Sequence, residues 1–289
     1  MSKQLFTPKQ VARAIGVSES SLKRWCDRGL IPTVRTAGGH RRLPVEGVLA
    51  FLRQSRRALV HPELLGLPAL SGRGSQTLRQ ARQRLIDSLV RGEDMVCRQV
   101  ILELYLAGQR LCVIFDEVVA EAFHQIGEKW ETGEVEVYQE HRACEICERG
   151  LRELRLMLPP PQASRPPRAI GGAIDGDPYR LPTMLVEIVL RVKGWAATSL
   201  GPLLPFATLR AAVERESPEL VWLSASSIAD LSPFLRDYNA FFAEISPGVP
   251  VVVGGRALTE KVRKQMNYTV YCDNLQHLES FLASFRPQA

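Results

Sequence analysis

Apolar residues recur at the spacing of an α-helix through the middle of the chain. Between residues 112 and 131 the apolar face consists of Val113, Phe115, Val118, Val119, Ala122, Phe123 and Ile126. This pattern and others like it predict helices over 76–91, 94–107, 112–131 and 135–157. Four helices with short connections are typical of an antiparallel bundle, so we expect residues 76–158 to form one.

The last third of the chain alternates short apolar runs with helical patterns. The runs predict strands at 168–175, 196–200, 220–225, 250–253 and 269–272. Between and after them, helical spacing predicts helices at 181–193, 205–216, 229–244, 257–266 and 275–285. This alternation indicates a doubly wound parallel sheet with helices on both faces, an α/β domain over residues 169–289.

The first sixty residues predict a helical pair followed by a hairpin. Thr7 and Pro8 begin a helix that reaches Ile15, because a capping hydroxyl followed by proline is a helix start. Residues 16–18 form a tight turn, and a second helix runs from Ser18 to about Arg28, with Leu22 and Trp25 as its buried face. Residues 33–44 then form two extended arms around Gly38-Gly39. We expect a winged helix-turn-helix head.

Two segments without such patterns predict linkers. SGRGS (71–75) follows a loop-like stretch from His61, and PPPQASRPPR (159–168) is too rich in proline to continue a helix. The chain is therefore expected to be multidomain. The predicted parts are an all-α winged head at 1–70, a four-helix bundle at 76–158 and an α/β domain at 169–289.

The charge is concentrated in the head. Residues 1–60 contain twelve Lys or Arg and three acidic residues, a net charge of +9, whereas the whole chain is +6 and the rest therefore about −3. A basic head on a slightly acidic body favours a polyanion as partner of the head. No apolar run is long enough for a membrane span and the N-terminus is not a secretory signal. Six scattered cysteines do not predict a disulfide framework, which favours a reducing compartment. Together these features lead us to expect no membrane association and a cytoplasmic location.

Candidate DNA-contacting side chains lie on the second helix and on the hairpin. The second helix of such a pair fits the major groove, where Arg24 is suited to reading guanine and Lys23 to contacting phosphate. The hairpin cations are suited to neutralising phosphates. The full candidate set is Ser20, Ser21, Lys23, Arg24, Arg35, Thr36, His40, Arg41 and Arg42. The alternative is a solvated charged hairpin beside an unrelated helical pair.

The segment LFTPKQVARAIGVSESSLKRWCDRGLIPTVRTAGGHRRLP resembles the MerR-type winged head over its full length. The resemblance includes the aromatic residue of the second helix, Trp25, and the GGHRR wing. It implies double-stranded operator DNA as a partner and a homo-oligomer, a dimer or tetramer, that reads two half-sites.

The C-terminal third carries a spaced set similar to that of cobalamin-binding flavodoxin-like domains. Asp177 begins the first motif, which ends at Pro182. Ser224 and Ser226 follow that motif after 41 intervening residues, and Gly254 and Gly255 follow after 27 more. These positions end the first, third and fourth predicted strands, where parallel sheets bind ligands. Their small side chains are expected to leave a slot for the nucleotide tail of the cofactor. The alternative is that Gly-Gly after a strand merely begins a helix.

A second match lies in the predicted bundle. Trp130, nine residues, and then Glu140-His141 reproduce the signature of the helical cap in B12-dependent MerR-type photoregulators. The resemblance implies that these three side chains crowd the upper face of the corrin. Taken singly, Trp130 fits a bundle core and the other two fit a solvated helix face.

One position departs from the family. Tyr179 stands where the first motif carries the histidine that ligates cobalt from below, Pro182 replaces the motif glycine, and Glu131 replaces a histidine that some light-sensing members carry. A phenol is a poor donor to cobalt at neutral pH, so no metal ligand is assigned. Cobalamin, as adenosylcobalamin or another form, then binds with its own base or a weak ligand; otherwise the pocket holds a different ligand or none.

A further constellation, His141, Cys144 and Cys147, follows a metal-like spacing. On one helix these residues fan over too wide an arc to meet at a tetrahedral ion, and cysteine is a common buried small residue, so structural filling is favoured. No catalytic set is evident.

The sequence therefore predicts a regulator, not an enzyme, in which a cobalamin-like module senses a ligand or light and controls assembly and operator binding. One alternative is a cobalamin-independent repressor whose C-terminal part is an oligomerisation scaffold. The other, a B12-dependent mutase or methyltransferase, has no segment left for a substrate domain.

Overall fold

The computed structural model describes residues 5–67, 77–161 and 163–285. The predicted linker at 71–75 lies outside these residues. Contacts divide the chain into two compact units, Met1–Pro159 and Pro160–Ala289, and each is described by itself. Within the described ranges, no helix has the length and apolar composition needed to cross a bilayer.

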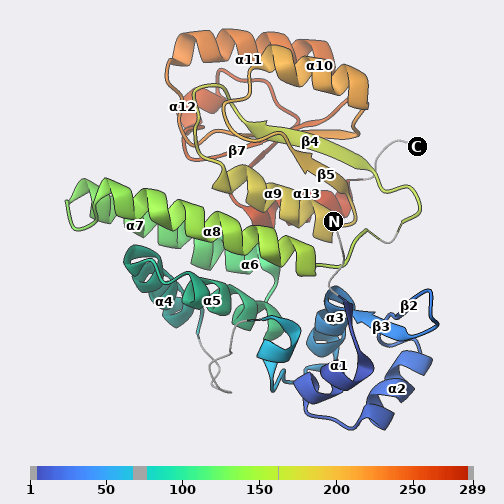
Figure 1. The fold of residues 1–289 in the computed structure, drawn as a ribbon. Coiled ribbons are helices and arrows are strands. Elements are labelled where there is room, and N and C mark those ends of the chain that lie inside the picture. Colours follow the sequence, from blue (N-terminus) through green and yellow to red (C-terminus); the bar gives the residue numbers. More distant parts are fainter. Residues whose placement is uncertain (1–4, 68–76, 162, 286–289) are drawn as a thin grey trace. The chain divides into compact units, whose positions relative to one another are not determined.

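The first unit begins with the winged head (Figure 1). Its elements are β1 (Leu5–Phe6), α1 (Pro8–Ile15), α2 (Glu19–Asp27), β2 (Val34–Arg35), β3 (Arg41–Pro44), α3 (Val45–Ser55) and the 3-10 turn η1 (Pro62–Leu65). The two predicted helices are present. Thr7 and Gln10 form a capping box at the start of α1, and Gly16 ends it with φ +74°. The hairpin strands β2 and β3 pair antiparallel, and β1 adds a third strand on the other side of β3.

Two elements of the head, α3 and η1, were not predicted from the sequence. Helix α3 buries Val45, Val48, Leu49 and Leu52, which is helical spacing, but it starts at Pro44 without a side-chain cap. The supposed loop from His61 contains η1, and Leu65 and Leu67 are buried in the head core. The head is therefore larger and better packed than two helices and a wing.

The bundle has the four predicted helical segments, one of them interrupted. Its elements are α4 (Leu78–Arg91), α5 (Asp94–Leu106), α6 (Leu111–Ile114), the π-helical segment η2 (Phe115–Ala120), α7 (Glu121–Glu131) and α8 (Val137–Met157). The prediction of one uninterrupted α-helix over 112–131 was wrong, because its middle six residues are π-helical. Glu117 belongs to that segment, and its carbonyl oxygen accepts a hydrogen bond from an Arg82 guanidinium nitrogen at 3.4 Å.

The head and the bundle share a hydrophobic core. Leu102 of α5 is buried in the head cluster, and Leu106 and Met157 pack against it. Arg53 at the end of α3 donates to the Gln109 carbonyl at 2.8 Å, and its guanidinium lies 4.5 Å from the centre of the Tyr105 ring. Helix α3 is thus the element that joins the head to the bundle.

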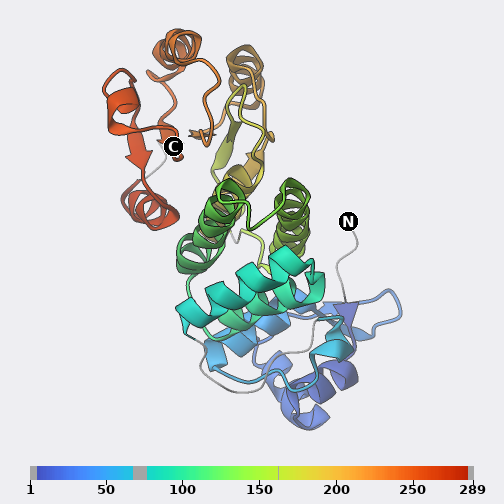
Figure 2. The ribbon, with the colours of Figure 1, turned by 90° about the vertical axis from the view of Figure 1, so that its left-hand side faces the viewer.

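The second unit is a five-stranded parallel sheet in the order β5-β4-β6-β7-β8. Its elements are β4 (Arg168–Ala173), α9 (Leu181–Val192), β5 (Ala196–Ser199), α10 (Phe206–Glu216), β6 (Leu220–Ser224), α11 (Leu231–Ile245), β7 (Val251–Gly254), α12 (Glu260–Arg263), β8 (Val270–Cys272) and α13 (Leu275–Ser284). Helices α9 and α13 lie on one face of the sheet and α10 and α11 on the other (Figures 1 and 2). This is the flavodoxin-like arrangement, so the predicted fold class is confirmed.

Helix α12 is shorter than the predicted 257–266. The Ala257 amide donates to the Ala225 carbonyl and the Leu258 amide to the Gly255 carbonyl, which holds the first residues in a turn against the end of β6. Helical geometry therefore begins later, at Glu260.

Candidate DNA interface and ligand site

The start of α2 is organised by Ser18. Its hydroxyl oxygen accepts from the Ser21 amide at 3.2 Å and lies within hydrogen-bond distance of the hydroxyls of Ser20 and Ser21. An Arg24 guanidinium nitrogen in turn donates to the Ser21 hydroxyl at 3.3 Å. These contacts fix the exposed N-terminal half of α2, the part of a recognition helix that meets base edges.

Lys23 and Arg24 are both exposed on α2, but they differ in what they contact. The Lys23 amine forms an ion pair with Glu19 one turn earlier at 3.1 Å. Within the described residues Arg24 has no acidic partner. Binding of Lys23 to phosphate therefore competes with an exposed ion pair, which is worth well under about 1 kcal/mol.

The wing is a tight hairpin. Arg35 pairs with Arg41 in the strand register, and the Thr36 hydroxyl accepts from the His40 amide at 3.2 Å across the turn. Gly39 has φ +78°, a conformation that a side chain disfavours. Arg35 and His40 are exposed, whereas Arg41 and Arg42 are half-buried. Arg35 on the outer strand and His40 at the tip are therefore the more accessible to phosphate.

Arg41 has a structural partner that the sequence did not indicate. Its guanidinium forms an ion pair with Asp27 at the end of α2, at 2.8 Å. This contact joins the wing to the recognition helix. Of the predicted DNA-contacting cations, Arg41 therefore orients the surface as well as adding charge to it.

The buried face of α2 differs in part from the prediction. Leu22 is buried as expected, but its companion is Cys26, and burial raises the pKa of that thiol. Trp25 is half-buried, with its ring 4.9 Å from the Phe51 ring and 4.7 Å from the Arg57 guanidinium. Trp25 thus packs α2 onto α3 at the edge of the core.

In the bundle, Trp130 lies on the last turn of α7 and Glu140 and His141 on the first turns of α8. Trp130 is 49% exposed, so it is not a core residue. Glu140 is half-buried and accepts from the Cys144 thiol at 3.4 Å, and its other oxygen lies 3.7 Å from the His141 ring nitrogen Nε2. Helices α7 and α8 lie side by side (Figure 1), which places the three residues at one end of the hairpin.

The two cysteines of α8 pack within the bundle, where Cys147 is buried and Cys144 is half-buried. Burial raises the pKa of the Cys144 and Cys147 thiols well above the ordinary value, so both are protonated. Within the described residues no three His, Cys, Asp or Glu side chains form a group that could hold a metal ion. All six cysteines are free.

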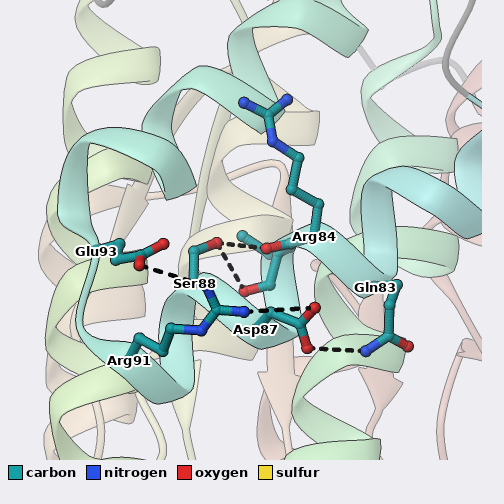
Figure 3. A network of polar contacts seen from close by, with 7 residues as sticks. Gln83, Arg84, Asp87, Ser88, Arg91 and Glu93 are labelled. Atoms are coloured by element: carbon teal, nitrogen blue, oxygen red, sulfur yellow. Dashed lines mark hydrogen bonds and ion pairs between the residues drawn. The ribbon is translucent and has the colours of Figure 1, made fainter.

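The bundle surface also has a hollow that contains none of the predicted site residues. It is lined by Gln80, Gln83, Arg84, Asp87, Ser88, Arg91, Glu93 and Val96. Figure 3 shows that its polar groups bind one another: Asp87 accepts from Gln83 at 2.9 Å, and Arg91 lies between Asp87 and Glu93. The charges compensate locally, so the hollow does not indicate a ligand of either sign.

In the second unit, Asp177 connects two loops at the carboxyl ends of β4 and β6. Its side chain is buried, and its two oxygens accept from the Tyr179 amide at 3.0 Å and the Ser226 amide at 2.5 Å. Burial raises its pKa, and the backbone donors oppose that shift. The carboxylate is therefore engaged with the backbone of this chain.

Tyr179 lies beside a residue that the sequence reasoning missed. It is 38% exposed, and the Arg256 guanidinium lies 5.7 Å from the centre of its ring. Arg256 Nε also donates to the Ser226 carbonyl at 3.2 Å. Its place in the sequence, directly after the Gly254-Gly255 pair at the end of β7, is the signal that could have indicated it.

The small residues of the second and third motifs are explained by close packing of strands. Ser224 is buried and pairs with Gly254 in the sheet register. A Cβ on Gly254 would lie 2.8 Å from the Cys272 carbonyl oxygen. On Gly255, which has φ +116°, it would lie 2.3 Å from the Ala225 carbonyl oxygen. The glycines are required by neighbouring backbone, so they do not by themselves indicate a slot for a nucleotide tail.

A corrinoid whose cobalt is bound by the protein needs a ligating side chain, usually an imidazole, near Asp177. His277 is the sole histidine in residues 160–289; it lies on α13 after β8, pairs with Asp273, and is separated from β4 by two strands. Among the described residues of the second unit, no imidazole therefore stands beside Asp177. The residues of this unit do not supply an imidazole for a protein-ligated cobalt ion.

The fold and these residues define a protein with a helix-turn-helix domain joined to a B12-binding type of domain. Residues 5–56 match the family described as "Helix-turn-helix domain", and residues 81–155 match the family described as "B12 binding domain". The second match falls on the helical bundle.

The chain is similar to two transcriptional repressors of Myxococcus xanthus. It is 26% identical to the HTH-type transcriptional repressor CarH over 275 residues, which cover 89% of this chain and 91% of that one. It is 25% identical to the HTH-type transcriptional repressor CarA over 267 residues, which cover 88% of each. Among solved structures it resembles a monomethylamine corrinoid protein of Methanosarcina barkeri, with a TM-score of 0.59 and 16% identity. That likeness covers 72% of this chain and all of the other, and shows the fold alone.

Proposed function

We propose that this protein is a DNA-binding transcription regulator, a repressor, whose cobalamin-type module senses a ligand and thereby controls assembly and operator binding. The observation that carries the proposal is the head: a capped recognition helix and a wing present exposed cations on a helix-turn-helix scaffold. The similarity to two repressors along nearly the whole chain supports the repressor assignment.

In this proposal the recognition helix reads bases and the wing contacts phosphates. Arg24, with Ser20 and Ser21 beside it, meets base edges, while Lys23, Arg35, Thr36, His40 and Arg42 contact the backbone. The regulator binds as a homo-oligomer, a dimer or tetramer, so that two heads reach two half-sites.

Ligand sensing requires that the ligand prefer one assembly state. The candidate ligand is cobalamin, which when bound supplies a corrin chromophore responsive to light. The candidate contacts to it are Trp130, Glu140 and His141 on the bundle and, considered separately, Tyr179 and Ser226 in the C-terminal unit.

The test of the head is a salt titration of DNA binding, using a duplex selected by the protein from a random library. The slope of log affinity against log salt should be about −0.9 for each phosphate contacted. Arg35→Ala should reduce that slope by about one and weaken all duplexes alike, whereas Arg24→Ala should lose roughly 1–3 kcal/mol of sequence discrimination.

Arg215→Ala is the matched control, because it removes an exposed positive charge from α10 in the other unit. It should change neither slope nor discrimination. A shallow slope that the head variants leave unchanged would contradict the assignment of the head.

The second candidate function is a cobalamin-independent repressor in which the C-terminal unit is an oligomerisation scaffold. The absence of an imidazole beside Asp177 among the described residues of the C-terminal unit favours it. Mixing the protein with adenosylcobalamin or hydroxocobalamin, desalting, and recording the spectrum separates the two. Retained corrinoid that changes DNA affinity or particle mass, in darkness or after illumination, supports the sensor; no retained colour supports the scaffold.

A further inference from the structure

Trp222 fills the layer between the C-terminal sheet and helix α9. It is 1% exposed and lies in the middle of β6. Its neighbours in the strand, Val221 and Leu223, belong to the core shared with α10 and α11, so the indole points to the opposite face of the sheet. There its Nε1 donates to the Thr183 hydroxyl of α9 at 2.9 Å. The side chain therefore spans the distance from strand to helix.

The indole ring also lies against the backbone of strand β4. Gly171 of β4 pairs with Trp222 in the sheet register. A Cβ added to Gly171 would lie 2.3 Å from a ring carbon of the indole and 2.1 Å from the Trp222 carbonyl oxygen. A side chain at this position would collide with both. The space that a side chain of β4 would need is thus occupied by the indole of β6.

The polar groups next to the indole are paired with one another. The Thr183 hydroxyl lies 3.1 Å from the Ser199 hydroxyl of β5, and the Ser199 oxygen accepts from the Gly201 amide at 3.3 Å. Within the described residues, no buried side-chain nitrogen or oxygen of α9, β5 or β6 lacks a hydrogen-bond partner. A layer made of an aromatic ring and satisfied hydrogen bonds offers no polar group for a ligand to pair with.

This layer is where the slot predicted from the sequence would have to open. Ser224 lies two residues after Trp222 on the same face of β6, about 7 Å nearer the carboxyl edge. Ser224 and its neighbour Gly254 are the small residues from which the sequence predicts room for a nucleotide tail. A group that passed them would meet the indole. An indole is a fused bicyclic ring of nearly the same outline as the benzimidazole or purine base that ends such a tail.

We infer that Trp222 completes the core of this unit with the protein's own bicyclic ring, so that the unit is closed to an inserted nucleotide tail. Trp222 is then the residue that decides ligand specificity here, because a corrinoid held through its ring gains nothing from its tail. This inference stands apart from the proposed ligand, since the layer is filled whether or not a corrinoid binds at the carboxyl edge.

The first measurement asks whether the indole occupies a space with the shape of a base. Trp222→Ala in the full chain should lower the melting temperature of the second unit by roughly 10–20 °C, because a large core side chain is removed. Free dimethylbenzimidazole at millimolar concentration should restore about 3–6 °C by entering the cavity. It should leave the unmodified chain unchanged. If Trp222→Ala does not fold, Trp222→Leu takes its place in both measurements.

The second measurement compares hydroxocobalamin with cobinamide, which lacks the nucleotide tail, by equilibrium dialysis. The unmodified chain should bind the two within about twofold of each other, whereas Trp222→Ala should prefer hydroxocobalamin by about tenfold or more, since the base can then be buried. Trp195→Ala is the matched control. It removes a buried tryptophan directly before β5, where the ring stacks on Phe285, and should create no such preference.

Where corrinoids bind, a preference of the unmodified chain for hydroxocobalamin as large as that expected of Trp222→Ala overturns the inference. A preference in Trp222→Ala no greater than in Trp195→Ala also overturns it. Retention of no corrinoid by any of these chains contradicts the proposed ligand instead. In that case stabilisation of the Trp222 variant by free dimethylbenzimidazole supports the filled layer, and the absence of stabilisation overturns the inference.

Discussion

Gly255 shows how strongly one residue is constrained at the carboxyl edge of the C-terminal sheet. Its φ of +116° lies in a region that side chains rarely adopt, and an added Cβ would meet the Ala225 carbonyl oxygen at 2.3 Å. The neighbouring atom is backbone of β6's exit loop, which is itself hydrogen bonded to Gly254 and Ala257. It cannot move aside at low cost.

We therefore expect Gly255→Ala to lower the free energy of unfolding of the C-terminal unit by about 2–5 kcal/mol, through strained backbone and overpacking. Urea denaturation followed by circular dichroism measures it. Gly248→Ala is the control, because nothing lies within 4 Å of its added Cβ and its φ is not in the left-handed region. That change should stay within about 0.5 kcal/mol. Equal effects of the two substitutions would show that the contact at Ala225 is not limiting.

The candidate sites were predictable in position more than in role. The capping serine, Arg24 and the wing cations could be placed from local rules alone, since caps and turns depend on adjacent residues. The partners of Asp177 and Arg41 could not. Asp177 binds amides that its own loop and a distant loop supply, and Arg41 binds Asp27 across the head. Such pairings depend on the tertiary fold, and no periodicity in the sequence encodes them.

Helix α3 is the element on which the organisation of the first unit depends. It follows the wing strand β3 directly, buries one face in the head core, and contacts the Tyr105 ring of α5 through Arg53. Its apolar spacing was present in the sequence, yet the start at Pro44 carries no hydrogen-bonding cap. The strands of the second unit were predicted to within a residue or two, because buried parallel strands are short continuous apolar runs.

Arg53→Ala should loosen the junction between head and bundle. The substitution removes a hydrogen bond from a charged donor and a cation–π contact, so the free energy of unfolding should fall by about 1–3 kcal/mol. Amide hydrogen exchange should become faster in α3 and α5. Arg56→Ala removes the same charge from an exposed side chain that, in the described part of the chain, makes no hydrogen bond or ion pair. Unchanged exchange in α5 after Arg53→Ala would count against the junction.

For the molecule as a whole, the division at residues 159 and 160 separates two self-contained cores. The head cluster and bundle form one, and the sheet with its flanking helices forms the other. Net charge follows a different division, since the head alone is strongly basic and the bundle and sheet together are slightly acidic. The first unit therefore combines a strongly basic head with a bundle that does not share its positive charge.

Limited digestion of the full chain with subtilisin should cut the exposed stretch Ala163–Arg165 and release a C-terminal fragment beginning near residue 164. Because that fragment contains the whole second core, it should resist further digestion, which mass spectrometry follows over time. Disappearance of the fragment as fast as the intact chain would mean that the second unit is not stable by itself.

The π-helical segment Phe115–Ala120 has a consequence for comparing this chain with its relatives. Each of its hydrogen bonds spans one residue more than in an α-helix, so the segment holds an inserted residue relative to an uninterrupted helix. An alignment with a relative whose helix is continuous should place a one-residue gap there. If the gap is placed elsewhere, each residue between it and the segment is compared with a residue about 100° away around the helix axis. The correspondence of Trp130 to a residue in another protein then depends on where that gap is set.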